Sequence, residues 1–258
     1  MYPTLFKIGP FVFGTIWIFV GISVYVFLKL LVKAIQKNRG DFKFLYQNST
    51  ALIIGFFIGA RFTHVATNFS YYFYDFSLHS FLSTFTIWDK GFSFWGGLIT
   101  VLFMIYMKTR TRKESFKKWM DYMTEPFLYA LPIAYLGKFL DGMGYGTKTD
   151  LPIGIAFKNM NVSIIDPVHP TQIYSMTLLI IAILIFRHVQ KSKPKLRQIK
   201  GARSSFAIGL ISTILLIEHL FRGDPTVEIF NVRAGVYISL VIAIASWIYL
   251  IKNIKKSK

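Results

Sequence analysis

The sequence predicts an all-α, multi-pass integral membrane protein, and three observations support this fold class. Hydrophobic residues make up 53% of the 258 residues and the mean hydropathy is +0.47, which is more apolar than an ordinary soluble domain. Long apolar stretches recur along the chain. Most of the 30 Lys and Arg residues lie in the short segments between those stretches.

Seven apolar stretches are long enough to cross or nearly cross a hydrocarbon layer of about 30 Å at a helical rise of about 1.5 Å per residue. They lie near residues 11–35, 51–69, 92–107, 124–145, 170–188, 205–221 and 234–251. The third and sixth stretches are short, so we expect flanking Lys and Arg side chains to reach back to the interface. No internal repeat is visible, and residues 1–258 are expected to form a single membrane domain.

The distribution of positive charge predicts the orientation, because Lys and Arg in short loops accumulate on the cytoplasmic side. Basic residues are concentrated at residues 33–43, 108–118, 187–203 and 252–258. This alternation predicts an odd number of spans, with the N-terminus outside and the C-terminus in the cytoplasm.

The segments between the predicted spans differ in character. Residues 108–118 are compatible with an amphipathic interfacial helix that continues through Trp119 and Tyr122. On the opposite side, residues 69–89 are rich in Phe and Tyr, as interface-lying elements are. Residues 146–168 mix polar and apolar side chains, and we expect them to cap a cavity.

Charge and cysteine content exclude several functions. The net charge of +18 does not indicate nucleic-acid binding, because the basic residues are divided among three short segments and a tail instead of forming one folded face. Anionic lipid of the cytoplasmic leaflet is the expected partner of these segments. The chain has no cysteine, which excludes disulfides, thiolate metal sites and a cysteine nucleophile of its own. The first apolar stretch lacks the basic n-region of a signal peptide and is expected to be a retained helix.

A glycine-rich segment within the fourth stretch carries charge. Residues 134–146 read AYLGKFLDGMGYG, and HPTQIY follows at 169–174. Lys138 and Asp141 are three residues apart on one helix face, close enough to pair. An ionisable side chain inside a membrane is costly and is by default a functional-site hypothesis. One interpretation is the polar wall of a pocket, and the other is a buried ion pair among glycines that allow close helix packing.

Several segments together resemble the prolipoprotein diacylglyceryl transferase family, in order and over nearly the whole chain. They are MYPTLFKIGP at 1–10, IGAR at 58–61, FWGGLI at 94–99, the glycine-rich run and HPTQIY at 169–174. The resemblance implies transfer of a diacylglyceryl group from phosphatidylglycerol to the lipobox cysteine thiol of a prolipoprotein in the bacterial plasma (inner) membrane. It implies seven spans in the orientation above, release of glycerol phosphate, and no metal or cofactor.

The chain departs from the family's pattern at several polar positions. The family's signature helix begins Gly-Arg, with the arginine on the substrate phosphate, where this chain has Ala134-Tyr135. Two signature asparagines correspond to Lys138 and Asp141, and the signature glutamate corresponds to Met143.

Two further family positions differ. The family's histidine before Gly-Gly is Trp95 here. Its arginine ahead of the acidic end of the sixth helix falls on Ile214 or Leu215.

The resemblance and the retained polar residues together give a candidate site. The predicted catalytic residues are His169, Asp141 and Lys138, and the predicted substrate-binding residues are Arg61, Tyr135, Gly96, Gly97, Gln172, Glu218 and Arg222. His169 is the candidate base, because an imidazole can accept a thiol proton at neutral pH. Arg61 and Lys138 can hold a phosphate, because a positive charge acts more strongly in a low dielectric than in water. Lysine is a point charge without arginine's planar fork, so geometry and rate can differ from the family's.

Each of these residues also has a structural interpretation. His169 precedes a proline at a helix start. Arg61 can pair with Asp75 near the interface. Glu218, His219, Arg222 and Asp224 can form a structural or gating network.

Three functions therefore remain open from the sequence: a divergent diacylglyceryl transferase, a non-catalytic relative that binds phospholipid or signal peptides, and an unrelated channel or transporter. The first requires Arg61, Lys138 and His169 to point into one lipid-accessible cavity.

Overall fold

The computed structural model describes residues 4–8, 11–38, 40–75, 77–85, 91–157, 162 and 164–256, and these are predominantly helical. Five helices of the described residues are long and apolar enough to cross a membrane: α1 (Thr15–Lys37), α2 (Phe42–Thr67), α7 (Thr171–Ser192), α8 (Ala202–Phe221) and α9 (Ala234–Lys256). The chain is a multi-pass membrane protein. It divides into two compact units, Met1–Lys37 with Lys117–Lys258, and Asn38–Phe116.

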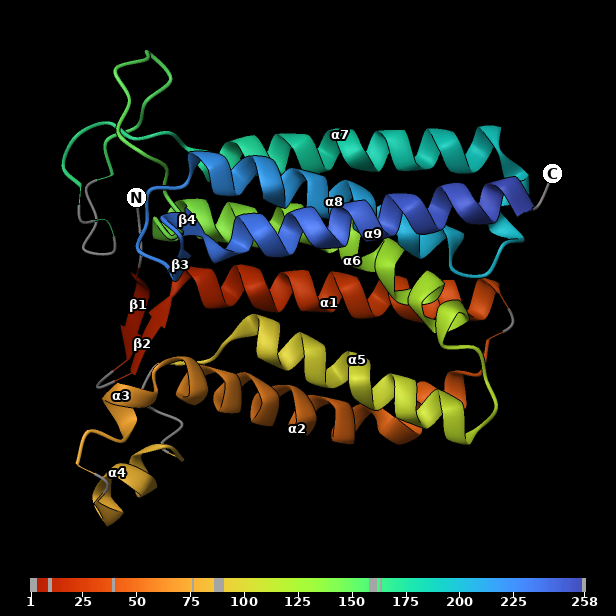
Figure 1. Cartoon of the computed structure of the whole chain (residues 1–258), viewed down its shortest axis with the longest axis horizontal. Coiled ribbons are helices and arrows are strands. Elements are labelled where there is room, and N and C mark those ends of the chain that lie inside the picture. Colours follow the sequence, from red (N-terminus) through yellow and green to blue (C-terminus); the bar gives the residue numbers. More distant parts are fainter. Residues whose placement is uncertain are drawn as a thin grey trace. The chain divides into compact units, whose positions relative to one another are not determined.

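The larger unit is built on long helices (Figure 1). Besides α1, α7, α8 and α9, it contains β1 (Thr4–Ile8), β2 (Phe11–Gly14), α6 (Phe116–Asp141), the 3-10 helix η1 (Pro194–Arg197), β3 (Glu228–Ile229) and β4 (Val232–Arg233). Helix α8 packs against both α7 and α9. The core between them contains the buried side chains of Leu128, Leu179, Phe186 and Phe206.

The smaller unit consists of α2, α3 (Phe69–Tyr72), α4 (Leu78–Ser83) and α5 (Phe94–Thr111). Helices α2 and α5 pack closely because glycines face each other across the contact. A Cβ at Gly59 would lie 2.8 Å from the carbonyl oxygen of Gly96, and a Cβ at Gly97 would lie 2.6 Å from the Phe56 ring. Small residues of this kind allow membrane helices to approach at backbone distance.

Each of the seven predicted stretches falls on a long helix. The structure differs from the predicted fold class by two short β-hairpins. Residues 11–14 form strand β2, paired with β1, ahead of α1, and a second hairpin pairs β3 with β4. The fold is therefore mostly helical, and the expectation of an all-α fold is corrected by these two short antiparallel hairpins.

Only the last part of the predicted interfacial helix joins the predicted fourth span, because residues 108–111 belong to α5 and residues 112–115 are not helical. Helix α6 runs from Phe116 to Asp141 and contains Pro126 and Pro132. It ends before residue 145 because Gly142 and Gly144 have φ of +81° and +72°, a conformation that terminates helices and favours glycine. Residues 86–90, 158–161 and 163 of the other two predicted interhelical segments lie outside the described residues.

Asp121 of α6 caps the N-terminus of α8. Its buried carboxylate accepts hydrogen bonds from the backbone N–H of Gly201 at 2.6 Å and of Ser204 at 2.8 Å. We expect Asp121→Ala to lower the free energy of unfolding by about 2 kcal/mol, because two buried helix N–H groups lose their acceptor. Asp121→Asn should cost less, since its amide oxygen still accepts. Thermal unfolding of the purified protein in detergent checks this order, and an unchanged midpoint for the alanine variant would contradict it.

Candidate functional site

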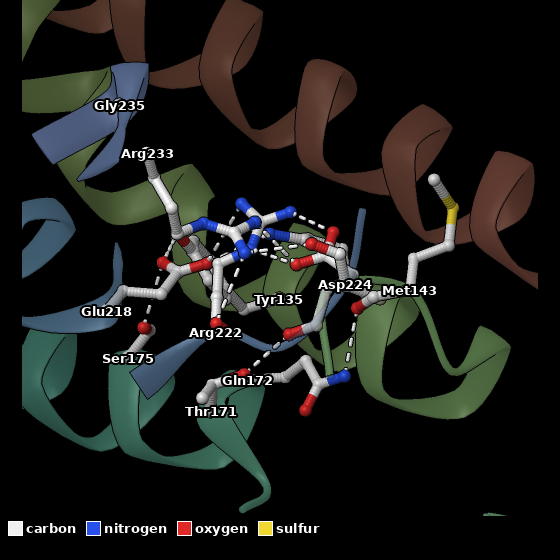
Figure 2. Close-up of polar contacts among 12 residues, drawn as sticks. Tyr135, Met143, Thr171, Gln172, Ser175, Glu218, Arg222, Asp224, Arg233 and Gly235 are labelled. Carbon is white, nitrogen blue, oxygen red and sulfur yellow. Dashed lines mark hydrogen bonds and ion pairs between the residues drawn. The ribbon is translucent and has the colours of Figure 1, made fainter. Parts of the chain in front are cut away.

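A buried carboxylate, Glu218 of α8, is the centre of a polar cluster at one end of the larger unit (Figure 2). Glu218 accepts a hydrogen bond from the Tyr135 hydroxyl and another, at 2.9 Å, from Ser175 Oγ. The Nζ of Lys138 lies 3.3 Å from Glu218 Oε1. The carboxylate of α8 is thus contacted by two side chains of α6, Tyr135 and Lys138, and by one side chain of α7, Ser175.

Arg222, Asp224 and Arg233 extend this cluster beyond the end of α8 (Figure 2). The Arg222 guanidinium lies 3.7 Å from Glu218 Oε1, and its Nε donates to Asp224 Oδ1 at 2.8 Å. Arg233 Nη2 donates to the same Asp224 oxygen at 2.9 Å. Burial opposes ionisation of Asp224, but the hydrogen bonds and positive charge of Arg222, with the charge of Arg233, hold the pKa of this carboxyl below its ordinary value.

The ion pairs of this cluster join three cations to two carboxylates. Lys138, Arg222 and Arg233 are the cations, and Glu218 and Asp224 are the anions. The side chains of Lys138 and Arg222 are 25% and 20% exposed. Two of these cations are thus still partly accessible, which suits them to an anionic ligand.

The glycine-rich run holds the chain against these cations. Gly146 N–H donates to the His169 carbonyl at 2.9 Å, and Gly223 N–H donates to the Tyr145 carbonyl at 2.9 Å. A Cβ at Gly144 would lie 3.3 Å from Lys138 Cε and 3.6 Å from Arg222 Nη2. These glycines let the backbone that follows α6 pass directly beside the charged groups.

The HPTQ motif fixes the start of α7 to the same backbone. The Thr171 hydroxyl donates to the Gly144 carbonyl, and Gln172 Nε2 donates to the Met143 carbonyl at 2.9 Å. His169 Nδ1 lies 3.1 Å from the Tyr174 hydroxyl, and its ring packs against Phe221. The motif thus binds the glycine-rich run while the His169 ring is held between α7 and α8.

A groove of about 350 Å³ lies between α7 and α8 beside this cluster. Its lining residues are Thr171, Tyr174, Ser175, Thr177, Leu178, Ile217, Glu218 and Phe221. Most of this surface is apolar, and the buried side chains of Glu218 and Ser175 are among its polar lining residues. The groove can therefore accept a largely apolar group while a polar end of that group meets the charged cluster.

The structure brings together the predicted site residues of the larger unit. Lys138, Tyr135, Glu218 and Arg222 form the cluster, and Lys138 makes its ion pair with Glu218. His169 and Gln172 reach the cluster through the glycine-rich run. Asp141, also predicted, is buried at the C-terminus of α6.

The other three predicted residues belong to the smaller unit. Gly96 and Gly97 lie in the contact between α2 and α5. Arg61 donates three hydrogen bonds to backbone carbonyls, from Nε to Thr84 at 2.8 Å, from Nη2 to Ser83 at 2.9 Å and from Nη1 to Gly91 at 3.1 Å.

Arg61 therefore fastens the segment after α4 to α2. We expect Arg61→Lys to raise amide hydrogen exchange in residues 77–85 and 91–93 by about tenfold or more, because a single ammonium cannot span the three carbonyls that the planar fork reaches. Arg112→Lys, at a partly exposed ion pair with Asp41, is the matched control and should leave this exchange unchanged. Equal exchange in Arg61→Lys and the parent protein would contradict this role.

Three members of the cluster, Ser175, Asp224 and Arg233, were not among the predicted catalytic or substrate-binding residues, and Asp224 was named only as part of a possible structural network. Ser175 lies one helical turn after Thr171, on the same face of α7. This spacing could have predicted that Ser175 belongs to the site. Arg233 reaches Asp224 through a hairpin whose pairing no short-range pattern indicated.

Comparisons with known proteins identify the family of this chain. Residues 3–252 match the family described as prolipoprotein diacylglyceryl transferase. A phosphatidylglycerol-prolipoprotein diacylglyceryl transferase of Polynucleobacter necessarius is 29% identical over 179 residues, which are 67% of this chain and 66% of that protein. Enzymes with the same description from Tropheryma whipplei strain Twist and Vibrio cholerae strain O395 are 27% and 25% identical, over 72% and 98% of this chain and 68% and 92% of those proteins. Because the family match extends over nearly the whole sequence, this chain belongs to the prolipoprotein diacylglyceryl transferase family.

Proposed function

We propose that this protein transfers a diacylglyceryl group from phosphatidylglycerol to the lipobox cysteine thiol of a prolipoprotein. The observation that carries the proposal is the junction of an apolar groove with a cationic cluster, where Glu218 lines the groove and pairs with Lys138 and Arg222. Family membership supports the same activity. We further propose seven spans in the bacterial plasma membrane, with the N-terminus outside, so that the cluster lies at the outer leaflet.

The reaction joins the cysteine sulfur to a glycerol carbon and breaks the bond from that carbon to a phosphate oxygen. The thiol proton must be removed, and the phosphate leaves with both electrons of the broken bond as glycerol phosphate. We assign the leaving phosphate to Lys138 and Arg222, whose charges stabilise the developing anion. His169 is the proposed base and would use Nε2, because Nδ1 is engaged by Tyr174.

The remaining predicted residues have supporting roles in this proposal. Tyr135 and Glu218 orient the cations, and Gln172 fixes the chain beyond α6. Asp141, predicted as catalytic, is buried at the end of α6. Arg61, Gly96 and Gly97 lie in the smaller unit, where Arg61 holds the segment after α4 and the two glycines allow α2 and α5 to pack.

Transfer is measured with the purified protein in liposomes that contain phosphatidylglycerol labelled in its acyl chains and a synthetic lipobox peptide. We expect the label to appear on the peptide and glycerol phosphate to be released in equal amount. Lys138→Ala should reduce transfer by about 100-fold, because it removes a charge placed at the leaving group. Lys148→Ala, at an exposed ion pair with Asp166, is the control and should transfer at the parent rate.

A second function is favoured by the pairing of the cations. Lys138 and Arg222 already share carboxylates within the protein. The resemblance places arginines at Tyr135 and at either Ile214 or Leu215. A non-catalytic relative that binds phospholipid or signal peptides fits this observation. Saturable phosphatidylglycerol binding by a well-folded protein without release of glycerol phosphate would establish this second function and exclude transfer.

A further inference from the structure

The hairpin between α8 and α9 carries a backbone conformation that its sequence does not favour. Strands β3 and β4 pair Ile229 with Val232. The two turn residues between them, Phe230 and Asn231, have φ of 52° and 60°. Positive φ at both central positions is the conformation of a type I′ hairpin turn, and asparagine adopts it readily. A bulky residue such as Phe230 is strained there.

Packing inside the protein does not explain why Phe230 occupies this strained backbone position. Phe230 is 92% exposed, and its apolar neighbours Val227, Ile229 and Val232 are also exposed. Strain that persists in a native structure is characteristic of functional positions. The hairpin therefore presents an apolar surface, with Phe230 at its tip, to something outside the chain.

The position of the hairpin next to a membrane span indicates what its apolar surface contacts. Helix α9 is a candidate membrane span and begins at Ala234, four residues after Phe230. Four residues of extended chain reach about 14 Å at most. The polar interface on each side of a bilayer is roughly 5–8 Å deep. The tip of the hairpin therefore lies within about 14 Å of the start of a candidate span and can reach the headgroup region. Trp and Tyr of membrane proteins are enriched there, and the apolar face of interface-lying elements commonly carries Phe.

The base of the hairpin is fixed to the charged cluster. Arg233 Nη1 donates to the carbonyl oxygens of Asp224 at 2.8 Å and of Arg222 at 3.2 Å, and its Nη2 donates to the Asp224 carboxylate. This base limits how far the tip can turn away from the membrane plane.

We propose that the β3–β4 hairpin is a membrane-seated element, in which Phe230 inserts its ring into the lipid interface at this end of the protein. The ligand is the phospholipid bilayer, contacted by Phe230, Ile229 and Val232. Through Arg233, the hairpin ties the charged cluster to a fixed depth below the leaflet surface. This role is independent of turnover.

The absence of cysteine from the sequence allows a direct test. Phe230→Cys, labelled with a nitroxide, is reconstituted in liposomes of phosphatidylethanolamine and phosphatidylglycerol. Collision rates with oxygen, which partitions into lipid, and with a water-soluble nickel chelate are then measured by electron paramagnetic resonance. Asp150→Cys, at an exposed position of the segment between α6 and α7, is the aqueous reference.

We expect the label at position 230 to collide several-fold less with nickel and more with oxygen than the label at position 150. Ile229→Cys, in the extended strand, gives a second reporting position if Phe230→Cys does not fold. Equal nickel accessibility at the hairpin and at position 150 would overturn the proposal. Protection that appears only after a lipobox peptide is added would also overturn it, since the surface would then belong to the peptide.

Discussion

Glu218→Gln is expected to abolish detectable transfer and to lower the free energy of unfolding by about 3 kcal/mol. The substitution keeps the size of the side chain but removes the negative charge shared by Lys138 and Arg222. Breaking a buried ion pair leaves a charge without compensation, which is one of the more costly single changes in a protein. Arg222 retains Asp224, so the largest effect falls on Lys138. Thermal unfolding in detergent and the liposome transfer assay measure the two effects.

A double variant separates stability from activity. Glu218→Gln with Lys138→Met removes both charges of the pair, so we expect it to recover most of the lost stability, as coupled positions do in a double-mutant cycle. Transfer should stay lost, because the cation proposed for the leaving phosphate is then absent. If Lys138→Met added its own full cost to that of Glu218→Gln, the two side chains would not be coupled and the assigned pair would be wrong.

The helical part of the fold could be predicted because each apolar stretch had to satisfy its backbone polar groups within lipid. This constraint acts on every long stretch, and the long helices follow it. It does not distinguish residues 11–14 from the helix that follows them, because both are apolar, yet residues 11–14 form strand β2. It also does not locate the start of α6, whose first turns carry the basic residues Lys117 and Lys118.

The site could be predicted only in part, because local spacing gives neighbours on one helix and not partners across helices. Lys138 and Asp141 share a face of α6, but the ion pair of Lys138 is with Glu218, 80 residues later. The HPTQ motif and the glycine-rich run were both visible, yet the hydrogen bonds of Thr171 and Gln172 to that run depend on the packing of α7. Arg61 was a visible charge whose carbonyl partners lie about 20 to 30 residues away in the chain.

Gly96→Ala is expected to lower the free energy of unfolding by about 3 kcal/mol, a cost at the upper end for overpacking. The added Cβ would lie 2.1 Å from Thr63 Oγ1 and 2.6 Å from the carbonyl oxygen of Gly59. A threonine rotamer change can relieve the first contact, but the second is with backbone, so α2 and α5 must separate. Thermal unfolding of the full chain in detergent measures the loss.

Gly21→Ala is the matched control, because a Cβ at Gly21 of α1 has no heavy atom within 4 Å. There the higher helix propensity of alanine should raise stability by about 0.5–1 kcal/mol. Gly96→Ala should therefore lower stability and Gly21→Ala should raise it. This contrast tests whether Gly96 is a packing residue or, as the sequence predicted, a substrate-binding residue. A purely substrate-binding glycine would give Gly96→Ala a raised KM for lipid at unchanged stability, whereas a packing glycine gives a lower unfolding midpoint before any substrate is added. Because α2 and α5 are the two long helices of the smaller unit, loss of their contact should also release the Arg61-bound segment and accelerate its amide exchange.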